Sequence, residues 1–339
     1  MFARTVKEIA LTPEIKKIAG IATDKATPAE LMKALLKADV DLLWFGGIGT
    51  YVKSSSQSNL DVGDRANDAI RINGEDASAK VIGEGANLGV TQLGRVEYAR
   101  KGGRINTDAI DNSAGVDTSD HEVNLKILLS TPQRRGELSM DARDTLLTDM
   151  TDDVAALVLD DNYEQTKALS VSQSRGTKDL DAQARFMRDL ERRGKLDRAV
   201  EYLPADEELR KRGQDNKGLT RPELAVLLAY AKLDLDAEIA ASGLPDDPYF
   251  EATLRGYFPK AVVERFPDAL KQHRLRREII STVLANRIVN LAGPVFIHRV
   301  KEVSSAPAWR VARAFIIAEG AFGLEALNGR IDALDSKVH

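Results

Sequence analysis

The chain has 339 residues, of which 43% are hydrophobic and 29% charged, so it is long enough for about two domains with apolar cores. A net charge of −4 does not favour a nucleic acid or a membrane surface as a partner, and the absence of cysteine excludes disulfides and cysteine metal sites. No apolar run approaches the roughly 18 residues of a membrane span, and the first residues lack the apolar core of a signal peptide. We therefore expect a cytoplasmic protein without a membrane-spanning segment.

Residues 1–130 alternate short apolar runs with glycine-bearing turns. A capping box at Thr27–Glu30, with proline at the first helical position, predicts a helix through about residue 37. The runs VDLLWF at 40–45 and KVIG at 80–83 predict two buried parallel strands. Further elements are expected at 64–70 (short helix), 91–101 (helix), 104–106 (third strand) and 111–129 (loop and helix). This alternation predicts a parallel α/β sheet.

Residues 131–339 have an almost entirely helical pattern, and we place the domain boundary near Ser130–Pro132. Helices are expected over 141–160, 179–193, 206–213, 221–241, 249–258, 275–303 and 308–328. A second capping box begins at Thr220, while Gly293 and Pro294 predict a kink or break in the penultimate helix. The predicted fold class is α/β followed by all-α.

Glycine-bearing or polar turns follow all three expected strands, at 46–50, 84–87 and 111–122. Ligands of open parallel α/β sheets bind outside the carboxyl ends of the strands, and small residues let a ligand approach the backbone closely. Three such turns on one edge would form a single crevice. The sequence therefore predicts a binding site there, without identifying its ligand.

Two motifs in these turns do not carry the chemistry they suggest at first sight. GGIGT at 46–50 is not a dinucleotide phosphate loop, because Val52 stands where a third glycine would be required, and no Gly-Lys-Ser/Thr triplet is present. Asp120, His121 and Glu122 are consecutive, so on a helix they point about 100° apart and cannot converge on one ion. We expect no metal site in the chain.

Several long segments resemble one family, the large bacterial NAD-specific glutamate dehydrogenases. They occur in family order along nearly the whole chain: DLLWFGGIGTYVKSS, DVGDRANDAIRI, KVIGEGANLGVTQLGRVEYARKGGRINTDAIDNSAGVDTSDHEVNLKILL, GLTRPELAVLLAYAKLDL and RLRREIISTVLANRIVN. VIGEGAN and IDNSAGVDTS also resemble, more weakly, two motifs of the smaller glutamate dehydrogenases. There, the first motif and the leading asparagine of the second line the cofactor site, and the valine and serine of the second contact the amino acid.

The resemblance implies roles for ten residues of this chain. On the cofactor side, facing NAD, it places Gly46, Gly47, Gly49, Thr50, Glu84, Gly85, Asn87 and Asn112. On the side of the substrate pair, L-glutamate and 2-oxoglutarate, it places Val116 and Ser119. The physical chemistry agrees, because an asparagine amide can donate to and accept from ribose hydroxyls, and a serine hydroxyl can donate to a carboxylate.

The resemblance also implies that parts of the enzyme lie elsewhere. In this family the first strand of the dinucleotide fold, its phosphate loop and the catalytic lysine and aspartate come well before the matched segments, and none of these motifs occurs here. Residues 1–4 resemble the middle of a family segment. We therefore expect no catalytic residue in this chain, which would hold the trailing half of a Rossmann-like domain (1–130) and a helical C-terminal domain (131–339).

The implied partners are the remaining N-terminal part of the same enzyme and further copies of it in a homo-oligomer. The implied reaction is oxidative deamination of L-glutamate to 2-oxoglutarate and ammonia with NAD, with no turnover by this chain alone. Two alternatives stay open: a related amino-acid dehydrogenase with another side-chain preference, and an assembly or regulatory module formed by the helical half, whose faces suit packing or oligomer contacts.

Overall fold

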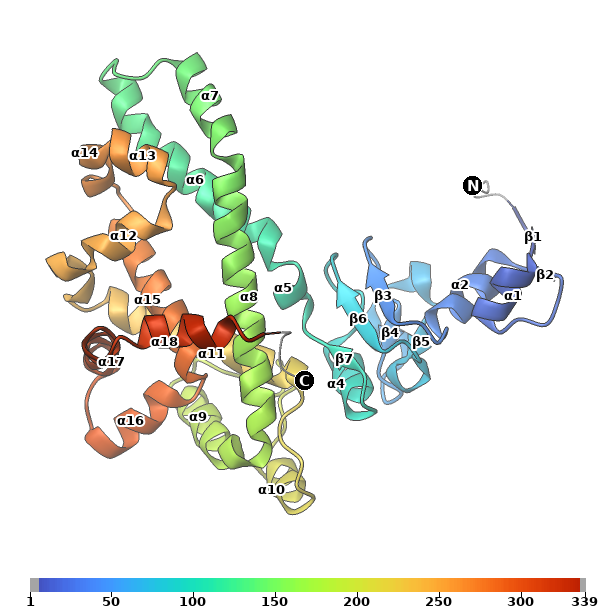
Figure 1. The fold of residues 1–339 in the computed structure, drawn as a ribbon. Helices are drawn as coiled ribbons and strands as arrows, with labels where there is room; N and C mark the ends of the chain where they lie inside the picture. Colours follow the sequence, from blue (N-terminus) through green and yellow to red (C-terminus); the bar gives the residue numbers. More distant parts are fainter. Residues whose placement is uncertain (1–5, 336–339) are drawn as a thin grey trace. The chain divides into compact units, whose positions relative to one another are not determined.

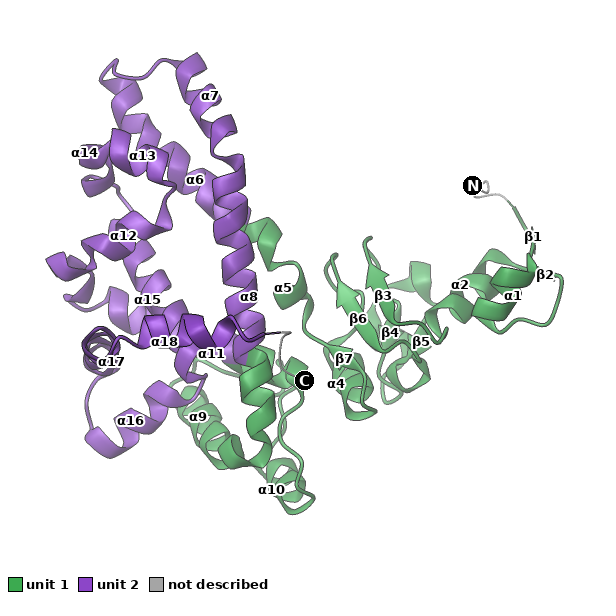
Figure 2. Ribbon diagram, viewed as in Figure 1, with its two compact units in different colours: residues 1–117, 169–227 green, residues 118–168, 228–339 purple. Residues whose placement is uncertain are grey.

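The computed structural model describes residues 6–335 and divides into two compact units, coloured separately in Figure 2. Unit 1 consists of residues 1–117 and 169–227, and unit 2 of residues 118–168 and 228–339. The boundary expected near Ser130–Pro132 lies instead inside helix α6 (Ser113–Arg134), because buried leucines at 125, 128 and 129 carry that helix across it. The expectation drawn from residues 1–4 lies outside the described residues.

The centre of unit 1 is a parallel sheet of three strands in the order β3 (Leu42–Phe45), β6 (Val81–Glu84) and β7 (Arg104–Ile105), which Figure 1 shows with helix α4 (Gln92–Arg100) nearby. The predicted parallel pairing is thus confirmed. Its core is formed by buried apolar side chains from the strands, α4 and the intervening loops, among them Phe45, Val52, Ile72, Ile82, Val90, Tyr98 and Ile105.

Strand β3 is buried on one face only. Phe45 is 6% exposed, but Leu42 and Trp44 on the opposite face are 55% and 56% exposed. The prediction of a fully buried strand is therefore wrong within the described residues. The indole of Trp44 lies over Gly83 of β6 and over Gly85 just after it, since a Cβ atom added at these positions would come within 2.6 and 2.4 Å of the Trp44 ring.

The other elements of unit 1 are short. They are β1 (Ile9–Ala10) antiparallel to β2 (Lys25–Ala26), β4 (Val52–Lys53) parallel to β5 (Ile72–Asn73), α1 (Pro13–Ala19), α2 (Pro28–Leu36), α3 (Asn59–Val62), α5 (Asp108–Asp111), α9 (Leu180–Arg192) and α10 (Asp206–Gln214). The capping box at Thr27 is confirmed by its bonds with Glu30. The helix expected over 64–70 shrinks to one turn at Arg65–Asn67, because the Asp64 carboxylate accepts the Thr50 N–H instead of capping a helix.

Unit 2 is helical throughout its described residues. Its elements, some shared with unit 1, are α6, α7 (Met140–Asp149), α8 (Thr151–Arg175), α11 (Arg221–Ala240), α12 (Glu251–Tyr257), α13 (Lys260–Arg265), α14 (Pro267–Lys271), α15 (Arg276–Ala292), α16 (Phe296–Ser304), α17 (Ala308–Phe322) and α18 (Leu324–Asp332). The break predicted at Gly293 and Pro294 is confirmed, with α15 and α16 bent by 90°. The single helix expected over 308–328 is wrong, because Gly323 adopts a left-handed φ of 61° and ends α17.

No single helix among residues 6–335 is long and apolar enough to cross a membrane; by length and composition alone, the bent pair α15 and α16 passes that test together.

Candidate functional site

The turns after β3 and β6 lie at the same edge of the sheet. Phe45 and Glu84, the last residues of these strands, are register partners, and the N–H of Ala86 donates to the carbonyl of Phe45 at 3.0 Å. Gly46 and Gly47 are exposed, and a Cβ atom at Gly47 would meet no atom within 4 Å, whereas one at Gly85 would lie 2.4 Å from the Trp44 ring. The backbone at 46–47 is therefore open, while the indole of Trp44 covers Gly85.

The turn at 46–50 is closed by Gly49. Its φ is +143°, and an added Cβ would lie 2.6 Å from the Tyr51 hydroxyl and 2.8 Å from the Asn67 amide nitrogen, so only glycine fits. The N–H of Thr50 donates to Asp64 at 2.9 Å, and the Tyr51 hydroxyl donates to the carbonyl of Ile48. This turn is therefore held by hydrogen bonds to the side chains of Asp64 and Tyr51.

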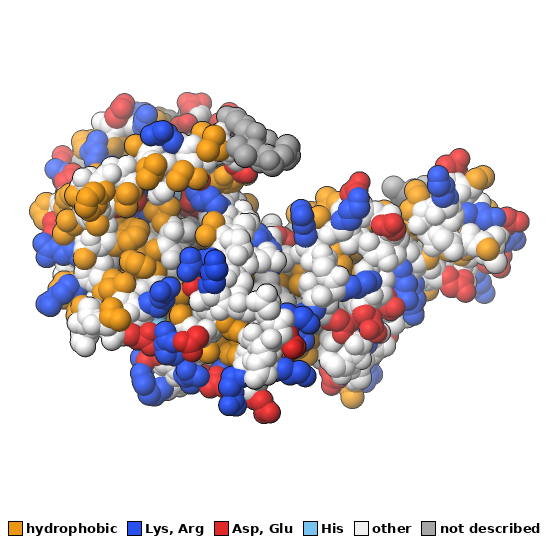
Figure 3. Space-filling view, turned by 60° about the horizontal axis from the view of Figure 1, so that its bottom comes forward, with side chains coloured by type: hydrophobic (Ala, Val, Ile, Leu, Met, Phe, Trp, Pro, Cys, Tyr) orange, Lys and Arg blue, Asp and Glu red, His pale blue; other side chains and the backbone are white. Residues whose placement is uncertain are grey.

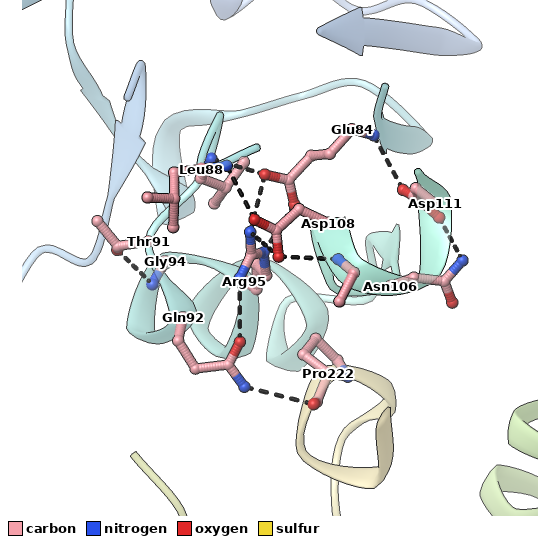
Figure 4. Close-up of polar contacts among 12 residues, drawn as sticks. Glu84, Leu88, Thr91, Gln92, Gly94, Arg95, Asn106, Asp108, Asp111 and Pro222 are labelled. Carbon is pink, nitrogen blue, oxygen red and sulfur yellow. Dashed lines mark hydrogen bonds and ion pairs between the residues drawn. The ribbon is translucent and has the colours of Figure 1, made fainter. Parts of the chain in front are cut away.

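The turn at 84–90 rests on a buried ionic network, drawn in Figure 4. The Glu84 carboxylate is fully buried and accepts two bonds from Arg95, at 2.6 and 2.9 Å, and one from the N–H of Val90. Arg95 also lies 3.1 Å from Asp108, which in turn accepts the N–H of Leu88 at 2.9 Å. Because its carboxylate points into the protein, Glu84 shapes the turn, and its assignment to the cofactor side stays a prediction.

Asn87 and Asn112, the two asparagines expected on the cofactor side, meet at this edge. The side-chain nitrogen of Asn112 (Nδ2) donates to the side-chain oxygen of Asn87 (Oδ1) at 2.5 Å, although the two residues are 25 positions apart in sequence. Asn87 is exposed. Each amide keeps further donor or acceptor capacity after this bond. The structure thus brings together residues that the sequence places in separate motifs.

Asp111, the residue before Asn112, ties this part of the chain to the end of β6. Its carboxylate accepts the N–H of Glu84 at 2.9 Å and the side-chain amide of Asn106 at 2.7 Å. Burial raises the pKa of Asp111, while these hydrogen bonds and the charges of Arg95 and Arg221 oppose the rise. Burial likewise raises the pKa of Glu84 against the opposing effect of Arg95.

The residues expected on the substrate side lie in the first turns of α6. The stretch from Ser113 onward is helical and not an extended strand-end turn. Val116 is 66% exposed, and Ser119, three residues further along α6, is also exposed. Their assignment to glutamate remains a prediction.

Sequence reasoning missed the supporting network of Arg95, Asn106, Asp108 and Asp111. No local signal joins Glu84 to Arg95, since the two are separated by a turn and meet only in the fold.

Asp120, His121 and Glu122 diverge as predicted: His121 is buried, whereas Asp120 and Glu122 are exposed and Glu122 pairs with Lys126. A hollow of about 690 Å³ in unit 1 lies at the opposite, amino-terminal edge of β6 and β7, beside Lys80, Tyr98 and Arg104.

Comparison with known proteins adds a family to this geometry. Residues 1–172 match the family described as bacterial NAD-glutamate dehydrogenase, catalytic domain, and residues 216–339 match glutamate dehydrogenase, C-terminal. Proteins named NAD-specific glutamate dehydrogenase are 51% identical in Pseudomonas aeruginosa, 48% in Halomonas elongata and 43% in Mycobacterium tuberculosis. Each match covers 100% of this chain but 21% of the relative, so the chain spans about a fifth of the length of these proteins.

Proposed function

Because the chain belongs to the bacterial NAD-glutamate dehydrogenase family, we propose that it supplies one wall of the cofactor cleft of an enzyme that oxidatively deaminates L-glutamate to 2-oxoglutarate and ammonia. The observation that carries the proposal is the bond between Asn87 and Asn112 at the carboxyl edge of a parallel sheet. Ligands of such sheets bind at this edge.

The residues at this edge fit the nicotinamide–ribose part of NAD. Exposed glycine backbone at 46–47 allows a planar or ribose group to approach closely, and the paired amides of Asn87 and Asn112 offer donors and acceptors to hydroxyl or carboxamide groups. The chemistry that NAD supplies when bound is acceptance of a hydride. The chain's own part is to bind and orient, with Val116 and Ser119 on the glutamate side.

We place the chemical groups that move protons outside this chain. The sequence offers no lysine-bearing substrate motif and no phosphate loop, and the relatives are about five times as long. In this proposal the three-stranded sheet is the trailing half of a Rossmann-like domain, completed by preceding sequence of the same cytoplasmic enzyme. Exposed apolar residues of unit 2, such as Val303 and Phe322 at 87% and 78%, suit contacts within a homo-oligomer.

A chimera tests the proposal. The matched fifth of the Pseudomonas aeruginosa relative is replaced by this chain, and glutamate-dependent formation of NADH is followed. We expect turnover by the chimera and none by the 339-residue chain alone, since its sequence lacks the expected catalytic lysine. An inactive but folded chimera contradicts the proposed function, and turnover by the chain alone contradicts the assignment of the chemistry to other sequence.

A further inference from the structure

The first turn of α11 reaches the site edge through a relay of side chains. Arg221 donates from Nε to the Asn106 carbonyl oxygen at 2.5 Å, and the Asn106 amide donates to Asp111 at 2.7 Å. The other Asp111 oxygen accepts the N–H of Glu84 at 2.9 Å. Three consecutive hydrogen bonds therefore connect α11 with the last residue of β6, all within unit 1.

A second relay starts from the next residue of the same turn. The carbonyl of Pro222 accepts from the Gln92 amide at 3.3 Å, and the Gln92 oxygen accepts from Arg95 at 3.3 Å. Arg95 binds Glu84 and Asp108, which hold the N–H groups of Val90 and Leu88 (Figure 4). Both relays thus end on the turn that carries Asn87.

The start of α11 is itself rigidly held. Glu223 accepts bonds from the N–H and hydroxyl of Thr220, both at 2.7 Å, and the first of these is one of the two bonds of the capping box predicted there. Arg212 of α10 grips the same carboxylate with two bonds, at 2.8 and 2.9 Å, and Glu223 is 1% exposed. A buried ion pair with two parallel hydrogen bonds fixes the relative orientation of the two side chains and also stabilises their contact.

Burial and the charge of Asp111 both act on Arg221, the first residue of this relay. Burial lowers the pKa of Arg221, while the negative charge of Asp111 opposes that shift. The negative charge of Asp111 therefore stabilises the charged form of Arg221. The side-chain amide of Asn106 lies between the two groups: its oxygen accepts from Arg221 and its nitrogen donates to Asp111. A relay of polar groups in a part-buried site holds its members more firmly than separate bonds in water.

We propose that Arg221 and Pro222 form a positioning element for the cofactor-side turn at 84–90. Through it, the segment that matches the C-terminal family domain sets the place of Asn87 and so the affinity for the nicotinamide–ribose end of the cofactor. Arg221 touches neither cofactor nor substrate in this assignment; it acts through Asn106 and Asp111. This inference rests on the proposed function.

Amide hydrogen exchange of the full chain tests the relay without any assay of activity. Removing a hydrogen bond to a charged group from a part-buried site speeds local exchange by about tenfold. We expect Arg221→Gln and Asn106→Ala each to speed exchange of the Glu84 amide by this factor, and the double variant to add little more, because both break one relay. Arg210→Gln, which changes an exposed arginine of α10, is the matched control and leaves the rate unchanged.

The kinetic consequence is measured in the chimera. Arg221→Gln is expected to raise KM for NAD by about tenfold, with kcat and KM for glutamate changed much less, and Arg221→Lys to restore part of the loss by keeping a donor near Asn106. A purely structural role would instead lower the amount of active enzyme without this split.

The outcomes separate the two proposals. The positioning role is overturned if the exchange rate of the Glu84 amide is unchanged. It is also overturned if Arg221→Gln changes kcat and KM for glutamate as much as it changes KM for NAD. If the chimera with the unaltered chain does not reduce NAD, the proposed function fails, while the exchange experiment still decides the relay. If Arg221→Gln does not fold, Asn106→Ala, which leaves both charges in place, carries the same test.

Discussion

At the scale of single residues, the site edge depends on charges that are taken out of water. Glu84 is fully buried and Arg95 is 4% exposed, so each carries a desolvation cost that its partners must offset. The same pair orders the N–H of Val90 and, through Asp108, that of Leu88. One ion pair therefore fixes most of the turn on which Asn87 stands.

Arg95→Met is expected to lower the free energy of unfolding by about 3–5 kcal/mol, since it leaves the Glu84 carboxylate buried without a charged partner. The double variant with Glu84→Gln should lose less than the sum of the single losses. Urea unfolding gives these values. Lys80→Met is the control, because Lys80 and Asp41 form an exposed pair, and it should leave stability nearly unchanged. A loss in Arg95→Met no larger than in Lys80→Met contradicts the account.

His273 in unit 2 is held in its neutral form by two hydrogen bonds. Its Nε2 lies 3.0 Å from the carbonyl of Asn124, and its Nδ1 accepts the N–H of Leu275 at 3.2 Å. Burial lowers the pKa of His273, while the bond to Asn124 and the charge of Glu278 oppose the shift. Protonation of Nδ1 would remove the acceptor on which Leu275 depends.

The stability of unit 2 should therefore decrease as the pH is lowered. Since the folded pKa of His273 is below that of the unfolded chain, stability is complete above the usual histidine pKa of about 6.5 and declines as the pH drops below it, by at most about 1.4 kcal/mol per unit for one proton. Thermal unfolding followed at several pH values measures this. His273→Gln, which can still donate to Asn124, should show a flatter dependence between about pH 6.5 and 5; the same slope as in the unaltered chain would rule out His273 as the cause.

At the scale of secondary structure elements, α4 packs on the sheet through Tyr98. This side chain is 1% exposed and its hydroxyl donates to the carbonyl of Ala79 at 2.5 Å. Gly103, just before β7, lies against the ring, and a Cβ atom there would overlap it. Neither partner has room to move.

Gly103→Ala should destabilise unit 1 by about 1–3 kcal/mol through this overlap. Gly213→Ala is the matched control, because a Cβ there would lie 3.6 Å from Leu180 in ordinary contact and alanine suits the helix α10 better than glycine. Urea unfolding of the two variants should show opposite signs. Equal effects would mean that the sheet adapts to the added carbon.

Much of the fold could be predicted at this scale, and the exceptions have physical reasons. The strands, their parallel pairing, the capping box at Thr27 and the break at Gly293 follow from local patterns. The exposure of Trp44 could not be predicted, since it depends on what covers the sheet. The continuity of α6 past Pro132 depends on tertiary packing of its leucines, and Gly323 ends α17 although glycine also occurs inside other helices.

The candidate site was predictable in its exposed parts only. The glycine turns and the two asparagines could be located from strand ends and from the family resemblance. Arg95, Asp108 and Arg221 could not, because their partners are distant in sequence and their role is visible only in contacts.

At the scale of the whole molecule, the chain is two compact units whose connections run inside α6, α8 and α11. In the view of Figure 3, acidic and basic side chains are interspersed over the surface, in keeping with the net charge of −4. The strand-end turns predicted from the sequence meet in the fold at the edge where the Asn112 side chain bonds to that of Asn87.

That edge is tested most directly by KM for NAD in the chimera carrying Asn87→Ala or Asn112→Ala. Loss of one cofactor hydrogen bond, or of the bond between the two amides, should raise KM for NAD by about tenfold, while Asn328→Ala on α18 leaves it unchanged. KM for NAD equal to that of the unaltered chimera in both site variants would contradict the assignment of this edge to the cofactor.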